Sequence, residues 1–517
     1  MSDAPGGPSA RVATAAGPPT LVVFITIDQF RGDYLARYGD QLRGGLKRIA
    51  ETGAVFANGF HDHAITETAP GHAATMSGRF PVHTGIVMNS QGVNTREYPL
   101  LFQAQGPGAA PFRFEGTTLI DWMVARDRRS RALSVSRKDR GAILPIGRSK
   151  QAVFWYSPDG DFTTSTWYSE TLPAWVVLFN GEQVPLKSAG QAWTLLRPAA
   201  DYPEPDSEPR ESHGRNFVFP HVAPTDSSAA AASYAAFPWM DSLTLAFALR
   251  GLEAMKLGAG PQVDLLNVSL STTDAIGHRY GPDSRELHDQ ILRVDRYLGL
   301  FLDSLFKLRD STRIIIALTG DHGVTPLPGV TRYDPNTGGR VVRLDSVTNR
   351  MRAGLLEARV DPDKAADFVD GVLVMDRGYL RGTRVNADSL VTWFADEVRK
   401  VPGVWRADRL RDLSRADTVN DDVARRWLHM FDPLRTNVAL VVTTEKWSVW
   451  SLGGDAQHGS PHDIDANVPV VFWGTMFKSR HFPDNVRVVD MAPTLAEALG
   501  LPVLETIDGR VLRRAFR

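Results

Sequence analysis

Four short apolar runs, each next to Asp or His, are the clearest pattern along this chain. They cover residues 21–27, 263–269, 314–318 and 468–473, and β-branched side chains are frequent in them. Uninterrupted apolar runs of this length are typical of strands that are buried on both faces, as in a parallel sheet with helices on either side. The pattern therefore predicts an α/β fold with a doubly wound, mostly parallel sheet flanked by helices.

Asp and His side chains, which commonly bind metal ions, lie at or just beyond three of these strand ends, and one more lies before the fourth run. We call such residues metal-type side chains. These residues are Asp28, Asp274, His278, Asp321, His322 and His458. In open α/β sheets, binding sites form beyond the carboxyl ends of the strands. The six side chains, which come from distant parts of the chain, are therefore predicted to form one site for two adjacent metal ions.

Each of these residues also has an ordinary structural explanation. An Asp after a strand is often only the N-cap of the next helix or the first residue of a turn. Asp274 and His278, four residues apart, would share one face of a helix, but Gly277, Gly281 and Pro282 favour a loop or a single turn there. It is the coincidence of all four segments that favours the metal site.

Thr68 stands at a predicted helix start. Pro70 is typical of a first helical position, where free backbone N–H groups and the helix dipole favour an anion. A Thr in this place is usually only a cap, but beside a zinc ion its hydroxyl would be activated as a nucleophile. His72 is predicted to stabilise the helix start and not to bind metal.

The motifs as a set resemble the alkaline phosphatase superfamily, and more narrowly its type I phosphodiesterase and nucleotide pyrophosphatase relatives. The matching positions are 28, 68–72, 89, 274, 278, 321–323 and 458–460. Segments 136–142 and 162–168 are similar to the branch of single-chain bacterial alkaline phosphatases with a Thr nucleophile. The similarity runs in order from about residue 20 to residue 495.

This resemblance implies two Zn²⁺ ions per chain. The implied ligand sets are Asp274, His278 and His458 for the first ion, and Asp28, Asp321 and His322 for the second. Three protein ligands and one open position are typical of a catalytic zinc site. Thr68, coordinated to the second ion, would attack phosphorus, and the reaction would pass through a phospho-threonine intermediate.

Lys138 and Arg140 bear on which phosphate ester is preferred. A monoester carries more charge than a diester, so cationic donors beyond the metals favour it. Without the resemblance, this pair would be a solvated basic turn; with it, the pair and Asn89 are predicted to contact the phosphoryl group, and the chain is predicted to be an alkaline phosphatase. The alternatives are a phosphodiesterase or nucleotide pyrophosphatase with the same Thr and metals, a catalytically silent binding protein, and a phosphomutase or other transferase.

The composition of the chain limits which classes of molecule it is expected to bind. The formal net charge is −1 over 517 residues, so there is no basic footprint for a nucleic-acid polymer. The expected partners are small phosphate monoesters, with inorganic phosphate as product, and no apolar run is long enough to cross a membrane. The chain has no Cys, which excludes disulfides, thiolate ligands and a Cys nucleophile. The sequence does not predict an oligomeric state.

Because the ligands span residues 28–458, the catalytic core must be discontinuous. The expected division is a flexible tail at 1–19, core segments at 20–150, 236–326 and 456–517, and cap insertions at 151–235 and 327–455. Residues 1–19 lack the apolar core of a signal peptide. A periplasmic or secreted location is expected from the family alone.

Overall fold

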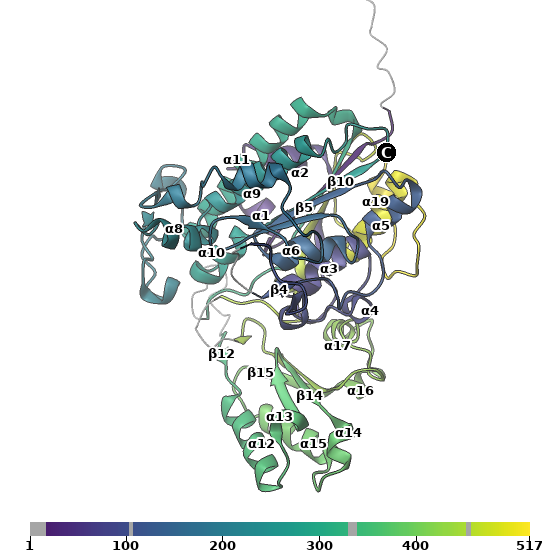
Figure 1. Cartoon of the computed structure of the whole chain (residues 1–517). Coiled ribbons are helices and arrows are strands. Elements are labelled where there is room, and N and C mark those ends of the chain that lie inside the picture. Colours follow the sequence, from purple (N-terminus) through teal and green to yellow (C-terminus); the bar gives the residue numbers. More distant parts are fainter. Residues whose placement is uncertain (1–16, 103–106, 329–338, 451–455) are drawn as a thin grey trace, which may run out of the picture.

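The central feature of the protein is a ten-stranded mixed sheet (Figure 1). The structure is a computed structural model, and it describes residues 17–102, 107–328, 339–450 and 456–517. Strand β1 (Leu21–Ile27) lies in the middle, with β10 (Asp264–Leu270) and β11 (Ile314–Thr319) parallel to it on either side. Three of the four apolar runs are therefore adjacent parallel strands, as predicted.

The sheet extends to both sides of these three strands. On one side β5 (Ala132–Ser136) and β6 (Ala152–Tyr156) continue in parallel, and β7 (Phe162–Thr163) is antiparallel to β6. On the other side β18 (Asn467–Trp473) is antiparallel to β11 and to β2 (Ala54–Phe60). The fourth apolar run is thus a strand of the same sheet that runs in the opposite direction.

Helices cover both faces of the sheet, which explains why its strands are apolar throughout. In β1, Leu21, Val23 and Ile25 point into one apolar cluster, whereas Val22 and Phe24 point into another. Three helices contribute to the first cluster: α2 (Gly45–Thr52), α9 (Trp239–Ala254) and α11 (Arg285–Leu308). Three contribute to the second: α3 (Thr68–Ser77), α5 (Leu119–Arg126) and α19 (Met491–Leu499). The predicted α/β class is confirmed.

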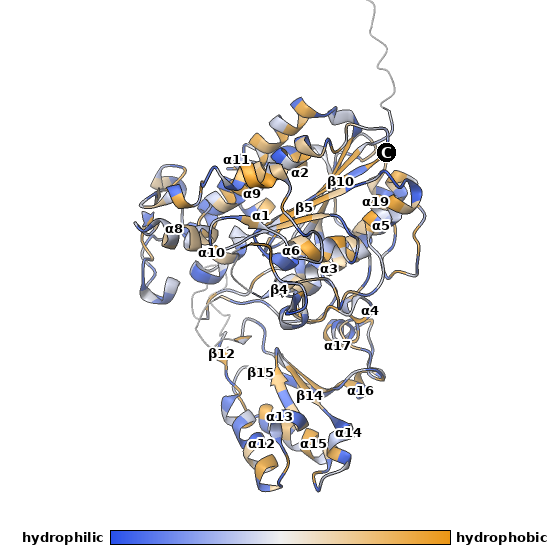
Figure 2. Cartoon of the chain, in the orientation of Figure 1, coloured by the Kyte–Doolittle hydropathy of each residue, from blue (hydrophilic) through white to orange (hydrophobic). Residues whose placement is uncertain are grey.

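Residues 341–450 form a second sheet with a hydrophobic core of its own. Its strands are β13 (Ala366–Val369), β14 (Val372–Met375), β16 (Val438–Thr444) and β15 (Val404–Arg409), in that order across the sheet. Helices α12 (Asp345–Glu357) and α15 (Ala387–Val398) pack against it. This unit lies to one side of the main sheet (Figure 1), and Figure 2 shows apolar residues along its sheet and helices.

The second unit is fastened to the main body close to the start of α3. Ala64, Ile65 and Met88 of the main body share one apolar cluster with side chains of the second unit, including Trp427 and Phe431. The buried carboxylate of Asp62 also accepts hydrogen bonds from the guanidinium of Arg425, at 3.1–3.2 Å. Both contacts hold the second unit beside the loop that leads into α3.

Residues 151–235 do not all form a separate insertion. Because β6 pairs with β5, the first strands of this segment complete the main sheet, and the predicted boundary at residue 151 was wrong there. The rest is pinned to α11 through Asp289, which accepts hydrogen bonds from Trp193 Nε1 and the Tyr202 hydroxyl, both at 2.7 Å. The predicted tail at 1–19 falls mostly outside the described residues.

The remaining elements are short. The helices are α1 (Tyr34–Arg37), α4 (Pro81–Thr84), α6 (Asp139–Ile143), α7 (Ala174–Asn180), α8 (Ser227–Ser233), α10 (Thr272–Tyr280), α13 (Pro362–Ala365), α14 (Arg377–Arg381), α16 (Leu410–Leu413), α17 (Asp422–Leu428) and α18 (Asp463–Ala466). The strands are β3 (Asn94–Thr95), β4 (Gly108–Ala109), β8 (Ala192–Trp193), β9 (His221–Val222), β12 (Val341–Val342), β17 (Val449–Trp450), β19 (Arg480–Phe482) and β20 (Val486–Arg487). Within the described parts of the chain, no helix combines the length and apolarity needed to cross a membrane.

Candidate metal centre and active site

The predicted ligands meet at the carboxyl ends of the central strands. Asp28 follows β1 directly, and its N–H donates to the carbonyl oxygen of Leu270 at the end of β10, at 2.8 Å. Asp321 and His322 follow β11 after a single glycine. Parallel strands end at the same edge of the sheet, so side chains almost 300 residues apart in sequence become neighbours.

Asp274 and His278 lie on a helix, and the predicted loop or single turn was wrong. Helix α10 spans Thr272–Tyr280, so the two side chains project from one face, four residues apart. Gly277 lies inside the helix, and a Cβ at this position would lie 1.7 Å from Gln29 Oε1. The absence of a side chain therefore leaves room for Gln29. Gly281, with φ +87°, follows the last helical residue. The two glycines therefore mark a close contact and a helix end.

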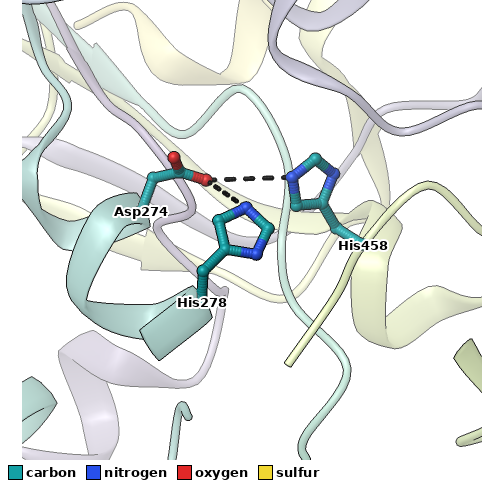
Figure 3. Close-up of side chains that lie close together, drawn as sticks. All are labelled: Asp274, His278 and His458. Atoms are coloured by element: carbon teal, nitrogen blue, oxygen red, sulfur yellow. Dashed lines mark ion pairs between the residues drawn. The ribbon is translucent and has the colours of Figure 1, made fainter. Parts of the chain in front are cut away.

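The first metal-type group consists of Asp274, His278 and His458 (Figure 3). One ligand atom from each lies within 4.8 Å of the others. His278 Nε2 is 3.1 Å from Asp274 Oδ1, and His458 Nε2 is 3.8 Å from the same oxygen. A carboxylate and two imidazoles that converge in this way match the ligand types of a catalytic zinc site.

The ring nitrogens of three histidines are oriented for metal binding. In His278, His458 and His322, Nδ1 lies 2.7–2.9 Å from a backbone carbonyl oxygen. A carbonyl only accepts, so Nδ1 carries a hydrogen and Nε2 is the nitrogen that is left to face the site. This second hydrogen bond is the usual device that fixes the tautomer of a metal-binding histidine.

The second group consists of Asp28, Asp274 and His322, and it is completely buried. Asp28 Oδ1 and His322 Nε2 are 3.5 Å apart, and neither has a hydrogen-bond partner among the described residues. Buried polar atoms without partners are costly, so two of them that face each other call for a further ligand. The donor set fits a divalent metal ion, and Asp274 is shared with the first group.

Asp321 borders the second group, and its oxygens have other contacts. Its Oδ1 accepts the N–H of Gln29 at 3.0 Å, and its Oδ2 lies 3.1 Å from His72 Nδ1 and 3.7 Å from His322 Nε2. Burial raises the pKa of Asp321, but the attraction of His322 and His72 outweighs it and holds that pKa far below its usual range. Asp321 is therefore anionic and within reach of the group.

Lys138 lies between the two groups. Its ammonium is 2.7 Å from Asp28 Oδ2, 2.7 Å from Asp274 Oδ2 and 3.0 Å from Thr68 Oγ1. Burial raises the pKa of Asp28, and the neighbouring Asp274 and Asp321 raise it further. For Asp274, burial is outweighed by Lys138, His278 and His458, and its pKa lies well below the usual range. Three buried carboxylates against the Lys138 ammonium and the Arg137 guanidinium, which is 3.8 Å from Asp274 Oδ2, leave an excess of negative charge that cations would neutralise.

Thr68 is the first residue of α3, buried, with its hydroxyl toward Lys138. Asn89 supports this helix start, because its Oδ1 accepts the N–H of Ala69 at 2.8 Å. The N–H of Asn89 donates to Glu67 Oε2 at 2.6 Å. Burial and the nearby Asp370 raise the pKa of Glu67 to about 7. The predicted nucleophile and Asn89 therefore belong to one connected structure.

Arg140 is near this structure but makes fewer contacts than Lys138. Its Nη1 is 3.6 Å from Asp139 Oδ1, and its buried Nε has no hydrogen-bond partner within the described ranges. Its charge helps to lower the pKa of Glu67 against the effect of burial. The guanidinium is therefore close enough to act electrostatically on Glu67, the residue before Thr68.

His72 uses both ring nitrogens for structure. Its Nδ1 lies 2.9 Å from the carbonyl oxygen of Thr68, and its Nε2 lies 2.9 Å from Ser269 Oγ. Gln29 was missed by the sequence analysis, although its Nε2 donates to Asp274 Oδ1 at 3.1 Å. Its backbone is left-handed, with φ +64°, and strained residues of this kind often mark functional sites. Its position directly after Asp28 was the only signal in the sequence.

The sheet and its covering helices define an α/β protein with the alkaline phosphatase fold. The crystal structure of wild-type alkaline phosphatase PafA is similar with a TM-score of 0.87 and 24% identity, covering 98% of this chain and 100% of that chain. The model of the type I phosphodiesterase / nucleotide pyrophosphatase family matches residues 22–413, and the chain belongs to this family.

Curated relatives are similar over nearly the whole length. Alkaline phosphatase PhoV of Synechococcus elongatus is 29% identical, over 96% of this chain and 92% of the relative. Alkaline phosphatase PhoK of Sphingomonas is also 29% identical, over 96% of this chain and 91% of the relative. The similarity therefore includes both the main sheet and the second unit.

Proposed function

We propose that this protein is a zinc-dependent alkaline phosphatase that hydrolyses phosphate monoesters through a phospho-threonine intermediate. The observation that carries the proposal is the position of the buried Thr68 hydroxyl beside two converging ligand groups that share Asp274. Its relatives named alkaline phosphatases support the phosphoesterase class. A periplasmic or secreted location stays a prediction.

The proposed ligands are three for each of two Zn²⁺ ions. Asp274, His278 and His458 would hold the first ion, and Asp28, Asp321 and His322 the second, with Asp274 close to both. When bound, the two ions would polarise the phosphoryl oxygens and lower the pKa of a coordinated hydroxyl. The other contributions to the reaction would come from the side chains that surround the phosphorus atom.

Thr68 would supply the nucleophile. Its Oγ forms a bond to phosphorus while the bond from phosphorus to the ester oxygen breaks, and the hydroxyl proton passes to solvent. The leaving alcohol departs on the side opposite Thr68 and is protonated by water. A water molecule then cleaves the phospho-threonine, which releases inorganic phosphate and restores Thr68.

Lys138, Arg140 and Asn89 would set the preference for monoesters. The Lys138 ammonium is 3.0 Å from Thr68 Oγ1, so a phosphoryl group on that oxygen would lie within its reach. Fixed cationic donors stabilise the more highly charged monoester more than a diester. Asn89 is held beside Ala69 by its Oδ1, which leaves its amide N–H groups for a phosphoryl oxygen.

A phosphodiesterase or nucleotide pyrophosphatase is the second candidate, because the family model carries that description. The deciding experiment compares kcat/KM of the zinc-loaded protein for phenyl phosphate and for methyl phenyl phosphate at mildly alkaline pH. A strong preference for the monoester supports the proposal. A preference for the diester favours the second candidate, and no turnover of either ester favours a silent binding protein.

A further inference from the structure

A cavity of about 570 Å³ lies beside the first metal-type group. Its described lining residues are Ser212, His213, Arg215, Ala275, His278 and Arg279. His278 is shared by the cavity and the group, and Ala275 follows Asp274 directly in α10. The volume suits a small molecule or part of one, and a nucleic-acid polymer would not fit in it.

Two arginines give this cavity a positive wall. The Nε of Arg279 donates to Ser212 Oγ at 2.7 Å, and its guanidinium lies over the ring of Tyr280 at 5.2 Å. These contacts fix the guanidinium, while its Nη groups have no hydrogen-bond partner among the residues the structure describes. Arg215 is exposed; its backbone N–H donates to the carbonyl oxygen of Ser212 at 3.0 Å, and its guanidinium has no hydrogen bond or ion pair with any described residue.

No carboxylate is among the described residues that line the cavity. Other arginines of the main body do pair with carboxylates: Arg293 pairs with Asp289 at 2.5 Å, and Arg37 pairs with Asp283 at 2.7 Å. Glu211, the residue before Ser212, is buried and does not line the cavity. The donors of Arg279 and Arg215 thus suit an anion brought by a ligand.

We propose that this cavity binds a second anionic group, a phosphate, carried by the leaving alcohol of the substrate. The inference rests on the proposed function and specifies its substrate class: small organic bisphosphates. Guanidinium groups present paired N–H donors that match the oxygens of phosphate, which is why arginine is common at such sites.

The position of the cavity supports this assignment. In the proposed reaction the leaving oxygen departs opposite Thr68, on the side of the first group. His278 is a member of that group and also a wall of the cavity, so the cavity begins where the leaving alcohol emerges. An anion a few bonds beyond the scissile oxygen would meet Arg279, the next residue of α10.

The kinetic test uses the monophosphate and the bisphosphate of propane-1,3-diol, whose leaving alcohols differ chiefly in the second phosphate. The ratio of kcat/KM for bisphosphate over monophosphate is measured for the wild type, Arg279→Gln and Arg215→Gln. We expect each substitution to lower this ratio about tenfold, as the loss of one charge-assisted contact implies. Arg128→Gln is the matched control, because Arg128 is an exposed arginine before β5, at the other end of the strand from Lys138.

A ratio unchanged in both cavity variants, or lowered equally in the control, would overturn the proposal. A second measurement does not depend on turnover. Titration calorimetry with propane-1,3-bisphosphonate and with propylphosphonate should give the wild type about tenfold tighter binding of the bisphosphonate, and the cavity variants should lose this difference. If neither propanediol ester is hydrolysed but this difference appears, the proposed function fails while the anion site stands; equal binding of the two phosphonates refutes the site.

Discussion

The two metal-type groups share Asp274 but differ in their access to solvent. In the first group, the His278 side chain is 28% exposed and borders a cavity. In the second, the Asp28 and His322 side chains are both fully buried. The first group is therefore open to solvent, and the second is closed; we refer to them as the open group and the closed group.

Burial also sets the charge at the two groups in different ways. In the closed group, burial raises the pKa of Asp28, and a cation there would relieve that cost. In the open group, burial lowers the pKa of His458, and the neighbouring His322 and His278 lower it further, so this ring stays neutral and available as a ligand. A metal ion bound in the open group should therefore exchange more easily than one bound in the closed group.

Thr68→Ala should have the largest effect on turnover. It removes the proposed nucleophile beside the closed group without removing a carboxylate or imidazole ligand, so kcat should fall on the order of 10⁴-fold or more. Zinc content, measured by mass spectrometry, should stay near that of the wild type. Thr68→Ser is the matched control and should retain measurable turnover. Turnover of Thr68→Ala at the wild-type rate would exclude Thr68 as the nucleophile.

His278→Ala and His322→Ala test the contrast between the groups directly. We expect the wild type to lose zinc to a chelator in a fast and a slow step, because the open group is more accessible. His278→Ala should remove the fast step, and His322→Ala should remove the slow one. Each variant should lower kcat on the order of 10³-fold, because the negative charge of the transition state would no longer be stabilised by one of the two cations.

The predicted difference in accessibility between the two groups is contradicted if both variants lose the same step, or if the wild type releases its zinc in one step. His462→Ala is a suitable control for the loss of an imidazole, because His462 Nε2 lies 2.8 Å from the carbonyl oxygen of Thr444 and belongs to neither group. Its zinc release should match that of the wild type.

Lys138→Ala combined with Arg140→Ala should affect substrate preference. Monoester kcat/KM should fall on the order of 10²-fold, because fixed cationic donors near the phosphoryl group are lost. Diester kcat/KM should change less than tenfold by the same argument. Each variant is compared on phenyl phosphate and methyl phenyl phosphate. Equal losses on the two esters would mean that the pair does not select between them, and that Lys138 only balances the carboxylates of Asp28 and Asp274.

The strands, and the meeting of most candidate ligands at one edge of the sheet, could be predicted because they depend on local patterns. Continuous apolar runs mark the strands that end at Asp28 and Asp321, and the parallel arrangement brings those ends together. Helix α10 was missed because glycines such as Gly277 and Gly281 usually interrupt or end helices, whereas Gly277 lies inside this helix and leaves room for the Gln29 side chain. That contact joins residues that are far apart in the sequence, so no local pattern predicts it.

The roles of Gln29 and Glu67 were missed for a similar reason. Both follow from contacts formed only in the folded chain: Gln29 with Asp321 across 292 residues, and Glu67 with Asn89 across 22. The boundary at residue 151 was wrong because β6 is a short apolar run rich in aromatic residues, and its sequence alone does not show that it pairs with β5 of the main sheet.

The smallest predicted effect concerns Asp241, which fixes the start of the helix that carries the open group. Asp241 Oδ1 accepts from the N–H and hydroxyl of Thr272 at 3.2 and 2.8 Å, and Oδ2 accepts from Gln290 Nε2 at 2.8 Å. Burial raises the pKa of Asp241 to about 6 despite these bonds. Because the folded state favours the protonated acid, this residue stabilises the fold at low pH, and the contribution is lost as pH rises through 6.

Asp241→Asn removes the titration but keeps an oxygen for Thr272. Relative to the wild type, the variant should therefore gain about 1 kcal/mol of unfolding free energy between pH 5 and pH 8. Urea unfolding of the metal-free proteins at both pH values measures this difference, since other groups titrate alike in both. A difference that is constant with pH would show that Asp241 stays ionised in the fold. The start of α10, and with it the open group, would then be held by a buried charge.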